Sequence, residues 1–450
     1  MTNIWWIRRD LRLTDNAALH SALEAGPTLP VFILDPALEN LSPRRMDFLF
    51  EGLAALDKEL RNRKSYLIIR KGKPVDVLCN LFDEIKAEAI YAEEDYTPYA
   101  RKRDSLIQKI LPLKLIQGQT VHHPKSILKQ DGRPYTVYTP YSKVWKAQLS
   151  KIKLHPAPED INTPSGIHSE PMPAFKSSPL FPAGEHEALR RLDQFTHVPI
   201  SKYADDRNRM DLDGTSALSP YLRFGMLGLR QAVHATLNAQ LVNQNSKGAE
   251  IWLNELIWRE FYIQILYHFP HVAKTSFNRS LTNIPWRNKP SEYEAWKAGR
   301  TGVPVVDAAM RQLKETGWMH NRARMIVASF LVKDLLIDWR WGESWFMENL
   351  LDGDIAANNG GWQWTAGTGT DAAPYFRIFN PVLQSAKFDP NGDYIRKWVP
   401  ELRGLNAKQI HTPWEFEIQI PGYPEQPIVD RELVKERTLK AYSISKESVK

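Results

Sequence analysis

Short apolar runs alternate with segments of helical period over the first 128 residues, and few folds accommodate that order. Five runs, rich in β-branched or aromatic residues and bounded by turns, are predicted strands: Ile4–Ile7, Leu29–Leu34, Tyr66–Ile69, Ala89–Ala92 and Leu113–Ile116. Three amphipathic segments between them are predicted helices: Asn16–Glu24, Asp47–Arg61 and Val75–Lys86. Because strand–helix–strand connections build parallel sheets, residues 1–130 are predicted to form an α/β domain with a doubly wound parallel sheet.

The turn after the first predicted strand lacks the glycine fingerprint of dinucleotide-binding folds. Arg8, Arg9 and Asp10 stand where GxGxxG would let the backbone approach a pyrophosphate. A dinucleotide is therefore not expected to bind this domain in the usual Rossmann manner. The fold class alone does not indicate a function.

The rest of the chain divides into a connection and a helical region. In residues 131–184 the periodicity fades and prolines accumulate, which predicts a long interdomain connection wrapped over the surface. Residues 185–450 are predicted to form an all-α second domain. Its amphipathic runs are Glu185–Phe195, Tyr221–Leu237, Glu250–Tyr267, Val305–Glu315, Asn321–Asp338 and Arg431–Tyr442.

Composition excludes several classes of protein. The single cysteine, Cys79, rules out internal disulfides and multi-cysteine metal sites and favours a reducing cytoplasm. No run of ~18 apolar residues is present, and the first residues lack the pattern of a secretory signal. The net charge of +7 is compatible with a polyanionic partner, but spread over 450 residues it is weak evidence for one. We expect a cytoplasmic protein with no membrane partner and no metal.

Residues 350–374, LLDGDIAANNGGWQWTAGTGTDAAP, combine acids, amides, glycines and indoles. The polar and aromatic members are Asp352, Asp354, Asn358, Asn359, Trp362 and Trp364. Glycine is unfavourable inside helices, and Asn and Asp prefer caps and turns, so an ordinary core helix is not expected. Small residues beside large aromatics let the backbone pass close to a flat ligand. The alternative is a glycine-rich loop with two surface indoles.

Three hydroxyl groups precede the predicted helix that follows residue 219. Thr215, Ser216 and Ser219 lie in DGTSALSPYLRFG, where Ser219 suits the N-cap position and Pro220 the first turn. Free backbone amides joined by hydroxyls can bind a phosphate. The alternative is an ordinary capped helix.

The predicted helix at residues 250–267 places an acid among indoles. Trp252, Glu255 and Arg259 share one face, and Trp258 lies one turn after Glu255. A carboxylate between two indoles is costly as a charge unless a partner compensates it. Glu255 could therefore donate or share a proton, or it could be a surface acid that pairs with Arg259.

A basic and polar cluster begins the next amphipathic run. Asn321 and Arg324 lie near one face of it, and Arg324 could neutralise an anion or pair with Asp352. His320 has no second ligand at metal spacing, so it is expected to be structural or to contact a base.

Long blocks of this chain closely resemble the class I cyclobutane-pyrimidine-dimer photolyases of the photolyase/cryptochrome family. The blocks are TSALSPYLRFG, WLNELIWREFY, GWMHNRARMIVASFLVKDLLIDWR and DGDIAANNGGWQWTAGTGTDAAPYFRIFNP. The opening WIRRDLRLTDNAAL and the closing IVDRELVKERTLKAY are similar to the same family, so the resemblance spans nearly the whole chain.

The resemblance implies a folded FAD in the helical domain. Residues that match contacts to its phosphates and neighbouring groups are Tyr203, Thr215, Ser216, Ala217, Leu218 and Ser219. Residues that match contacts to the rest of the cofactor are Trp252, Glu255, Arg259, Asn321, Arg324, Asp352, Gly353, Asp354 and Asn358. Asn358 matches the position facing the central-ring nitrogen. A neutral amide there cannot hand over a proton, which favours the reduced flavin anion with Arg324 offsetting its charge.

The implied activity is light-driven repair of UV-damaged DNA. The excited reduced flavin gives an electron to a pyrimidine dimer, the cyclobutane ring opens and the electron returns. Photolyases are base-flipping enzymes, so the dimer is expected to leave the duplex for a pocket. Trp258 and Trp364 match the indoles that pack against it, Glu255 the acid that hydrogen-bonds it, and Met325 a lining residue. The remaining matching DNA-binding residues are Arg207, Arg259, Asn321, Arg322 and Arg377.

Three tryptophans match the family's electron-transfer chain. Trp362, Trp339 and Trp286 would relay a hole from flavin to surface while the flavin is reduced. The alternative for each is ordinary core packing.

The first domain of this family often carries an antenna pigment. The folate-binding Asn-Glu pair is absent from Tyr96–Asp104, although Lys274 matches a folate-contacting lysine. DYTPYARKRD looks more like the deazaflavin-binding group. The antenna is left open between methenyltetrahydrofolate and 8-hydroxy-5-deazaflavin, with FMN as a third choice.

A cryptochrome, with the same fold but a signalling role, is the rival interpretation. Trp364, Glu255 and Met325 favour repair, as does the lack of a long extension past Lys450. Repair of the (6-4) photoproduct would need a histidine pair that His320-Asn321 does not supply. We expect a monomer that works on DNA in the cytoplasm.

Overall fold

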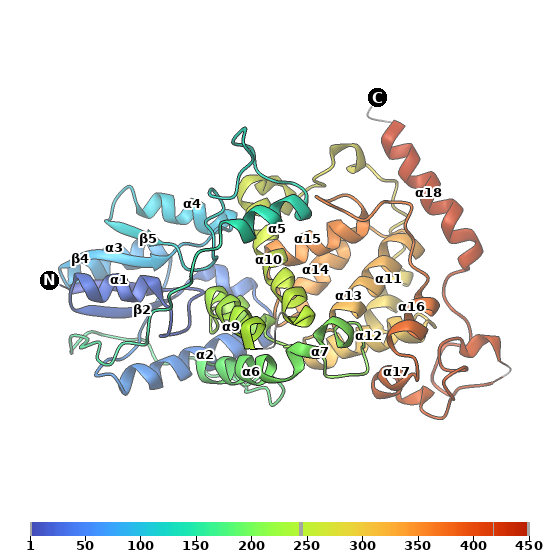
Figure 1. Cartoon of the computed structure of the whole chain (residues 1–450), viewed down its shortest axis with the longest axis horizontal. Coiled ribbons are helices and arrows are strands. Elements are labelled where there is room, and N and C mark those ends of the chain that lie inside the picture. The colour runs from blue at the N-terminus through green and yellow to red at the C-terminus, as the bar shows by residue number, and fades with distance from the viewer. Residues whose placement is uncertain (1, 243–245, 417, 448–450) are drawn as a thin grey trace. The chain divides into compact units, whose positions relative to one another are not determined.

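The computed structural model describes residues 2–242, 246–416 and 418–447 (Figure 1). Contacts divide the chain into two compact units, Met1–Ser201 with Ser216–His268, and Lys202–Thr215 with Phe269–Lys450. This division groups the helices of residues 216–268 with the N-terminal sheet. The sequence instead predicted an α/β domain at residues 1–130, a connection at 131–184 and a helical domain at 185–450. Those functional boundaries stay a prediction. Among the described residues, no helix has both the length and the apolar character needed to cross a membrane.

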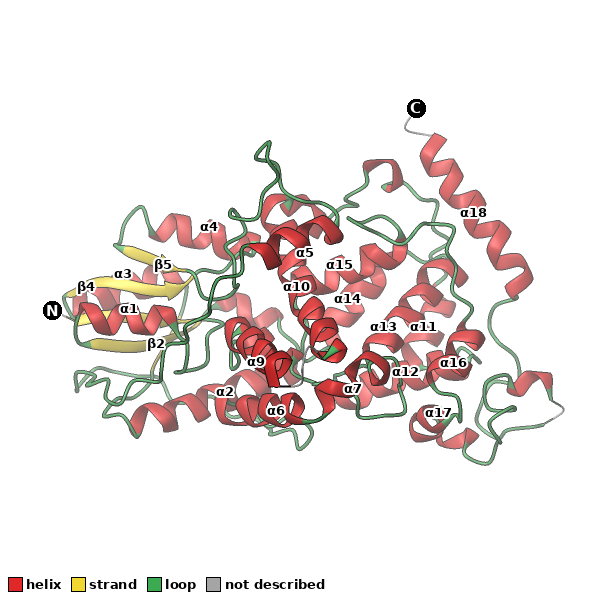
Figure 2. Cartoon of the chain, viewed as in Figure 1, coloured by secondary structure: helices red, strands yellow, loops and turns green. Residues whose placement is uncertain are grey.

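A five-stranded parallel sheet forms the centre of the first unit. Its strands are β1 (Thr2–Ile7), β2 (Thr28–Leu34), β3 (Ile68–Lys71), β4 (Ala87–Glu93) and β5 (Leu113–Ile116). The order is β3-β2-β1-β4-β5 and every pairing is parallel. All five predicted strands and the doubly wound arrangement are confirmed (Figure 2).

Helices between the strands complete the α/β fold. They are α1 (Ala17–Ala25), α2 (Pro43–Arg61), α3 (Pro74–Glu84) and α4 (Pro98–Ile107). The first three were predicted. Helix α4 was not predicted, although the sequence carries two signals for its start. Thr97 caps the helix by accepting a hydrogen bond from the Ala100 amide, and Pro98 occupies its first turn.

The predicted connection at residues 131–184 contains a helix that fading periodicity did not reveal. This is α5 (Tyr138–Ala147), and it is anchored to α10 (Lys247–His268). Trp145 of α5 is fully buried, and its Nε1 donates to Oε1 of Glu260 at 2.9 Å. The backbone amides of Val121 and His122 donate to the same carboxyl. Burial nevertheless raises the pKa of Glu260 to about 7.

We expect Trp145→Phe to lower the free energy of unfolding by ~1–3 kcal/mol, because Glu260 loses one of its donors in a buried place. The lost hydrogen bond favours the ionised carboxyl, so its removal raises the folded-state pKa of Glu260 further. The cost should therefore be larger at pH 8 than at pH 6. Urea unfolding at both pH values measures it. Lys143→Ala, at an exposed position of α5, is the control and should change stability by less than ~0.5 kcal/mol.

The remaining helices of the first unit are α6 (Glu185–His197), α8 (Ser219–Phe224), α9 (Leu229–Val242) and α10. The single helix predicted at Tyr221–Leu237 is wrong, because the chain turns at Gly225. Gly225 has φ 67, and a Cβ there would lie 1.7 Å from the carbonyl oxygen of Arg9. Helix α7 (Pro199–Asp206) contains the contact boundary at Ser201.

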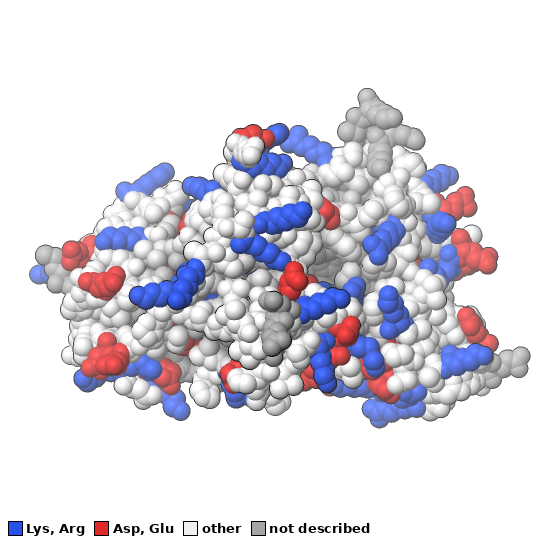
Figure 3. All heavy atoms as spheres, viewed as in Figure 1, with Lys and Arg blue, Asp and Glu red and all other residues white. Residues whose placement is uncertain are grey.

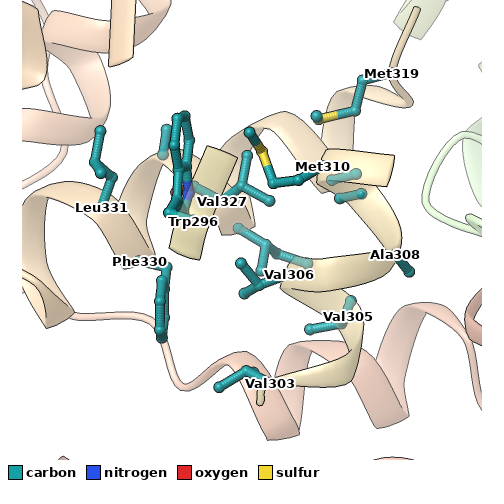
Figure 4. Packing of buried hydrophobic residues seen from close by; sticks show 14 of the residues in the cluster. Trp296, Val303, Val305, Val306, Ala308, Met310, Met319, Val327, Phe330 and Leu331 are labelled. Carbon is teal, nitrogen blue, oxygen red and sulfur yellow. The ribbon is translucent and has the colours of Figure 1, made fainter. Parts of the chain in front are cut away.

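The second unit is helical, which confirms the all-α prediction for its part of the chain. Its helices are α11 (Pro290–Ala298), α12 (Pro304–Thr316), α13 (Asn321–Ser329), α14 (Trp339–Asn349), α15 (Ile355–Ala366), α16 (Pro381–Phe388), α17 (Asp393–Trp398) and α18 (Arg431–Glu447). They enclose a core in which Trp296 lies among Val306, Val327 and Phe330 (Figure 4).

The helix predicted at Asn321–Asp338 is shorter than expected. Regular α-helix ends at Ser329, a π-helical turn covers Phe330–Asp334, and Leu336 then takes a left-handed conformation with φ 54. The buried Lys333 of the π turn donates to the carbonyl of Ala366 at 3.0 Å. Tertiary hydrogen bonds of this kind stabilise the irregular backbone where helical periodicity alone predicted a continuous helix.

Residues 355–366 form helix α15, so the expectation of non-helical backbone there is wrong. Asp354 caps the helix by accepting from the amides of Ala356 and Ala357, and Gly367 ends it in the left-handed conformation. Asn359 donates to the carbonyl of Val272. The polar residues inside α15 thus find partners in the tertiary structure, which overrides their weak helix propensity.

Candidate functional site

Asp352 and Arg324, which were predicted from the sequence as possible partners, form an ion pair in the second unit. Arg324 Nη2 lies 2.8 Å from Asp352 Oδ2, and Arg324 Nε donates to the carbonyl of Met319 at 2.9 Å. The Asp352 side chain is 4% exposed, and its Oδ1 is buried without a hydrogen-bond partner. Buried carboxylate oxygens are normally satisfied, so this atom fits a donor supplied by a bound ligand.

Helix α14 orients the amides of α15. Asn358 Nδ2 donates to the carbonyl of Glu343 at 3.0 Å, and Asn359 Nδ2 donates to the Glu343 side chain at 2.9 Å. Burial raises the pKa of Glu343 to about 7. Asp354, the N-cap of α15, and Gly353 are both buried near the start of this helix. The predicted cofactor residues of this block are therefore held by a second helix.

Helix α13 begins with the histidine that was predicted to be structural or base-contacting. His320 Nδ1 accepts from the Arg322 amide at 3.1 Å, which caps the helix. Burial, with the charges of Arg322 and Arg324, lowers the pKa of His320 to about 4, so this ring is neutral near pH 7. The structural role is thus supported. Asn321, the first residue of α13, is exposed.

The hydroxyl-rich loop before α8 has an unusual backbone. Helix α8 begins at Ser219 with Leu218 at the N-cap position, so the prediction that Ser219 is the N-cap is wrong by one residue. Ala217 has φ 48, a left-handed conformation that L-residues rarely adopt. Thr215 and Ser216 are half-buried. A strained, hydroxyl-bearing turn is a feature of ligand-binding loops.

Helix α10 carries the candidate residues of the first unit. Trp252 is 3% exposed and packs against Phe195 with ring centroids 5.0 Å apart. Arg259 Nη2 donates to the carbonyl of Leu222 at 3.3 Å, which connects α10 to α8. Glu255 is half-buried one turn before Arg259. The predicted face of α10 is thus confirmed, and it places aromatic, acidic and basic groups together.

Several predicted DNA-binding residues of the second unit lie together. Arg322 Nε donates to Asn208 Oδ1 at 2.8 Å, and Arg322 also contacts the sulfur of Met325. The Arg207 guanidinium lies 5.5 Å from the ring centroid of Tyr203. These contacts bring residues from the loop after α7 to the start of α13.

Two further predicted DNA-binding residues follow later in the second unit. Trp364 is half-buried on α15, and Arg377 is exposed beside Phe379 at 5.7 Å. Lys and Arg are interspersed with Asp and Glu on the face drawn in Figure 3. The basic groups on that face therefore do not by themselves mark a binding surface.

The three predicted electron-transfer tryptophans share one region of the second unit. Trp362 and Trp339 are each 2% exposed in the same core, and the half-buried Trp286 packs against it. Gly342 permits this packing, because a Cβ there would lie 2.1 Å from the Trp362 ring. This arrangement fits both core packing and a relay.

Sequence reasoning missed three residues that position the candidate lesion-binding, cofactor-binding and electron-transfer residues. Tyr138 stacks on Trp258, Glu343 holds the amides of α15, and Gly342 receives the ring of Trp362. Glu343 resembles a surface acid of an amphipathic helix, and Gly342 carries no chemical signal. The aromatic Tyr138 was visible, but only the fold places it beside α10.

Comparisons with known proteins agree over nearly the whole chain. Residues 3–163 match the family model described as DNA photolyase, and residues 252–444 match the FAD binding domain of DNA photolyase. The deoxyribodipyrimidine photo-lyase of Synechococcus sp. is 40% identical, covering 96% of this chain and 94% of that protein. That of Escherichia coli is 38% identical, covering 99% of both.

Solved structures give the same result. A class III photolyase from Agrobacterium tumefaciens is 37% identical with a TM-score of 0.94, covering 99% of this chain and 98% of that one. An archaeal photolyase from Sulfolobus tokodaii with two FAD molecules is 34% identical with a TM-score of 0.85, covering 99% and 100%. A cryptochrome from Synechocystis sp. is 30% identical with a TM-score of 0.89, covering 98% and 99%.

Proposed function

Because this chain belongs to the DNA photolyase family, we propose that it is a deoxyribodipyrimidine photo-lyase, which splits cyclobutane pyrimidine dimers in DNA by light-driven electron transfer from reduced FAD. The observation that carries this proposal is the buried carboxylate oxygen Asp352 Oδ1, open to a ligand donor within a block that matches the family's FAD-binding domain. The protein is proposed to act as a monomer in the cytoplasm.

The chain's own residues have defined tasks in binding the flavin. Asp352 Oδ1 would accept a hydrogen bond from the cofactor, and Arg324, paired with the same carboxylate, would compensate negative charge on the reduced flavin. The Asn358 amide is held by α14 and presents a group that gives up no proton. The turn at Ala217 offers backbone amides and hydroxyls to phosphate oxygens. When bound, reduced FAD supplies the electron that light drives to the lesion.

Lesion recognition is assigned to residues on three helices. Trp258 and Trp364 are each assigned to offer flat apolar surface to a flipped dimer, and Met325 is assigned an apolar contact with it. Glu255 hydrogen-bonds the dimer as negative charge develops on it. Arg207, Arg322 and Arg377, with Arg259 and Asn321, contact the DNA strand, and phosphate contacts make its affinity fall as salt increases.

Repair of a defined oligonucleotide tests the function. Reduced protein is mixed with DNA that contains one thymine dimer and illuminated with near-UV or blue light. Loss of the dimer only in the light supports the proposal. Intact flavin photoreduction without dimer loss would instead indicate a photoreceptor, the role suggested by the similarity to a cryptochrome.

A second, light-harvesting pigment is also proposed, either methenyltetrahydrofolate or 8-hydroxy-5-deazaflavin, with FMN less favoured. The archaeal relative from Sulfolobus tokodaii was solved with two FAD molecules, so a second flavin is also compared as a candidate pigment. The absorption spectrum of purified protein distinguishes these pigments. Bands of FAD alone after gentle purification and reconstitution would contradict the antenna proposal.

Glu255→Ala is expected to weaken dimer splitting by about tenfold to a hundredfold, since a lost charge-assisted hydrogen bond costs ~1.5–3 kcal/mol. FAD content should remain close to that of the wild type. The measurements are dimers split per absorbed photon and the FAD-to-protein absorbance ratio. Glu250→Ala, on an exposed position of α10, is the control. Loss of FAD with unchanged splitting per bound flavin would show that Glu255 serves cofactor retention instead.

A further inference from the structure

One face of the Trp258 indole is covered by an aromatic ring from residues 131–184. The sequence predicted only a connection for that segment. Tyr138 of α5 stacks on Trp258 with ring centroids 3.8 Å apart and planes only 5° from parallel. Phe261 meets the same indole edge-on at 88°, and Tyr262 is tilted by 37°. Tyr138 is therefore the neighbour among these three that lies flat on the Trp258 ring.

Tyr138 itself is held in place by its hydroxyl group and its helix. Its Oη donates to the carbonyl of Asn254 at 2.9 Å, one turn before Trp258 on α10. At the other end of α5, Trp145 donates to Glu260. Just before α5, Gln264 donates to the carbonyl of Tyr135 at 2.7 Å. Helix α5 thus lies against α10 with anchors on both sides of Tyr138.

This geometry has a direct consequence for a ligand that stacks on Trp258. An indole offers two faces, and Tyr138 covers one of them, so a flat ligand can stack only on the other. A side chain already held in one rotamer loses less conformational freedom on binding than a mobile one. Base–aromatic stacking depends on this face being presented correctly.

We propose that Tyr138 is a positioning residue for lesion recognition, which holds the Trp258 indole so that the face opposite Tyr138 receives the flipped pyrimidine dimer. The proposal rests on the proposed function, in which Trp258 stacks on the dimer. It assigns a part of the binding site to α5, and therefore to the segment between the α/β region and the helical region.

The test compares binding of two matched oligonucleotides, one with a single thymine dimer and one undamaged. Tyr138→Ala and Tyr138→Leu should weaken dimer binding by about fivefold to tenfold, since the stacked ring is removed while the phosphate contacts remain. Affinity for undamaged DNA and the rate of FAD photoreduction should stay at wild-type values. Tyr138→Phe keeps the stack and should bind dimer within about twofold of wild type.

A double-mutant cycle with Trp258→Ala separates positioning from general structure. In the Trp258→Ala background, Tyr138→Ala should have no further effect on dimer affinity. Equal losses for damaged and undamaged DNA, or a full additional loss without Trp258, would overturn the positioning role. If Trp258→Ala bound the dimer weakly but Tyr138→Ala bound it as tightly as the wild type, only the positioning role of Tyr138 would be overturned. Unchanged dimer affinity in Trp258→Ala would overturn it together with the lesion-binding role of Trp258.

Discussion

Replacement of Trp339 by Phe is expected to slow light-driven reduction of oxidised FAD by about tenfold or more, the change that ~1.4 kcal/mol of barrier produces. Dimer splitting by chemically reduced protein should remain nearly unchanged. Trp339 and Trp362 are both 2% exposed in one core, so a dissolved external reductant cannot reach these two indoles directly. Phenylalanine retains most of the packing but is much harder to oxidise than indole, so it interrupts the proposed relay.

The control for this prediction lies on the same helix. Trp345 of α14 packs partly against the same core, with Lys297 4.8 Å from its ring centroid, and it is not assigned to the relay. Trp345→Phe should leave photoreduction at the wild-type rate. Transient absorption after a laser flash and a steady-state repair assay measure the two activities. Equal losses of photoreduction and repair in Trp339→Phe would contradict the relay and favour core packing alone.

The α/β region was predictable because its physical signals are local. The central strands β1 and β2 are buried along most of their length and so become continuous apolar runs, and the edge strands β3 and β5 still begin with buried apolar residues. Helix α4 was missed although its cap and proline are local signals. The other errors occurred where long-range contacts decide the backbone. Gly225 ends a helix because the backbone of Arg9 approaches it, and Leu336 follows a π turn whose Lys333 binds a distant carbonyl.

The candidate site was predictable where its residues carry unusual chemistry. The pairing of Arg324 with Asp352 was one of two alternatives that the sequence left open, and the structure shows that pair. The conformation of α15 was not predictable from propensity, since its amides depend on Glu343 and on a carbonyl from another segment. Tyr138 was missed for the same reason, because its partner lies more than a hundred residues away.

Removal of the Arg324 side chain is expected to destabilise the FAD-free protein by about 2–4 kcal/mol. Arg324→Ala leaves the carboxylate of Asp352 buried without its cation, and one of its oxygens already lacks a partner. The cost is below that of a fully buried pair because the Arg324 side chain is 25% exposed. FAD content should fall as well. Urea unfolding is measured without flavin, because a bound ligand adds its own stabilisation.

Asp352→Asn provides the matched comparison, since it has the same shape but no charge. Its cost should be smaller, ~1–2 kcal/mol, because the cation left behind reaches water and its hydrogen bond to the side chain can persist. Both variants should retain less FAD than the wild type. The order of the two stabilities is the decisive quantity. If Asp352→Asn were the less stable variant, the buried charge would not be the controlling factor, and the pairing would matter chiefly for flavin binding.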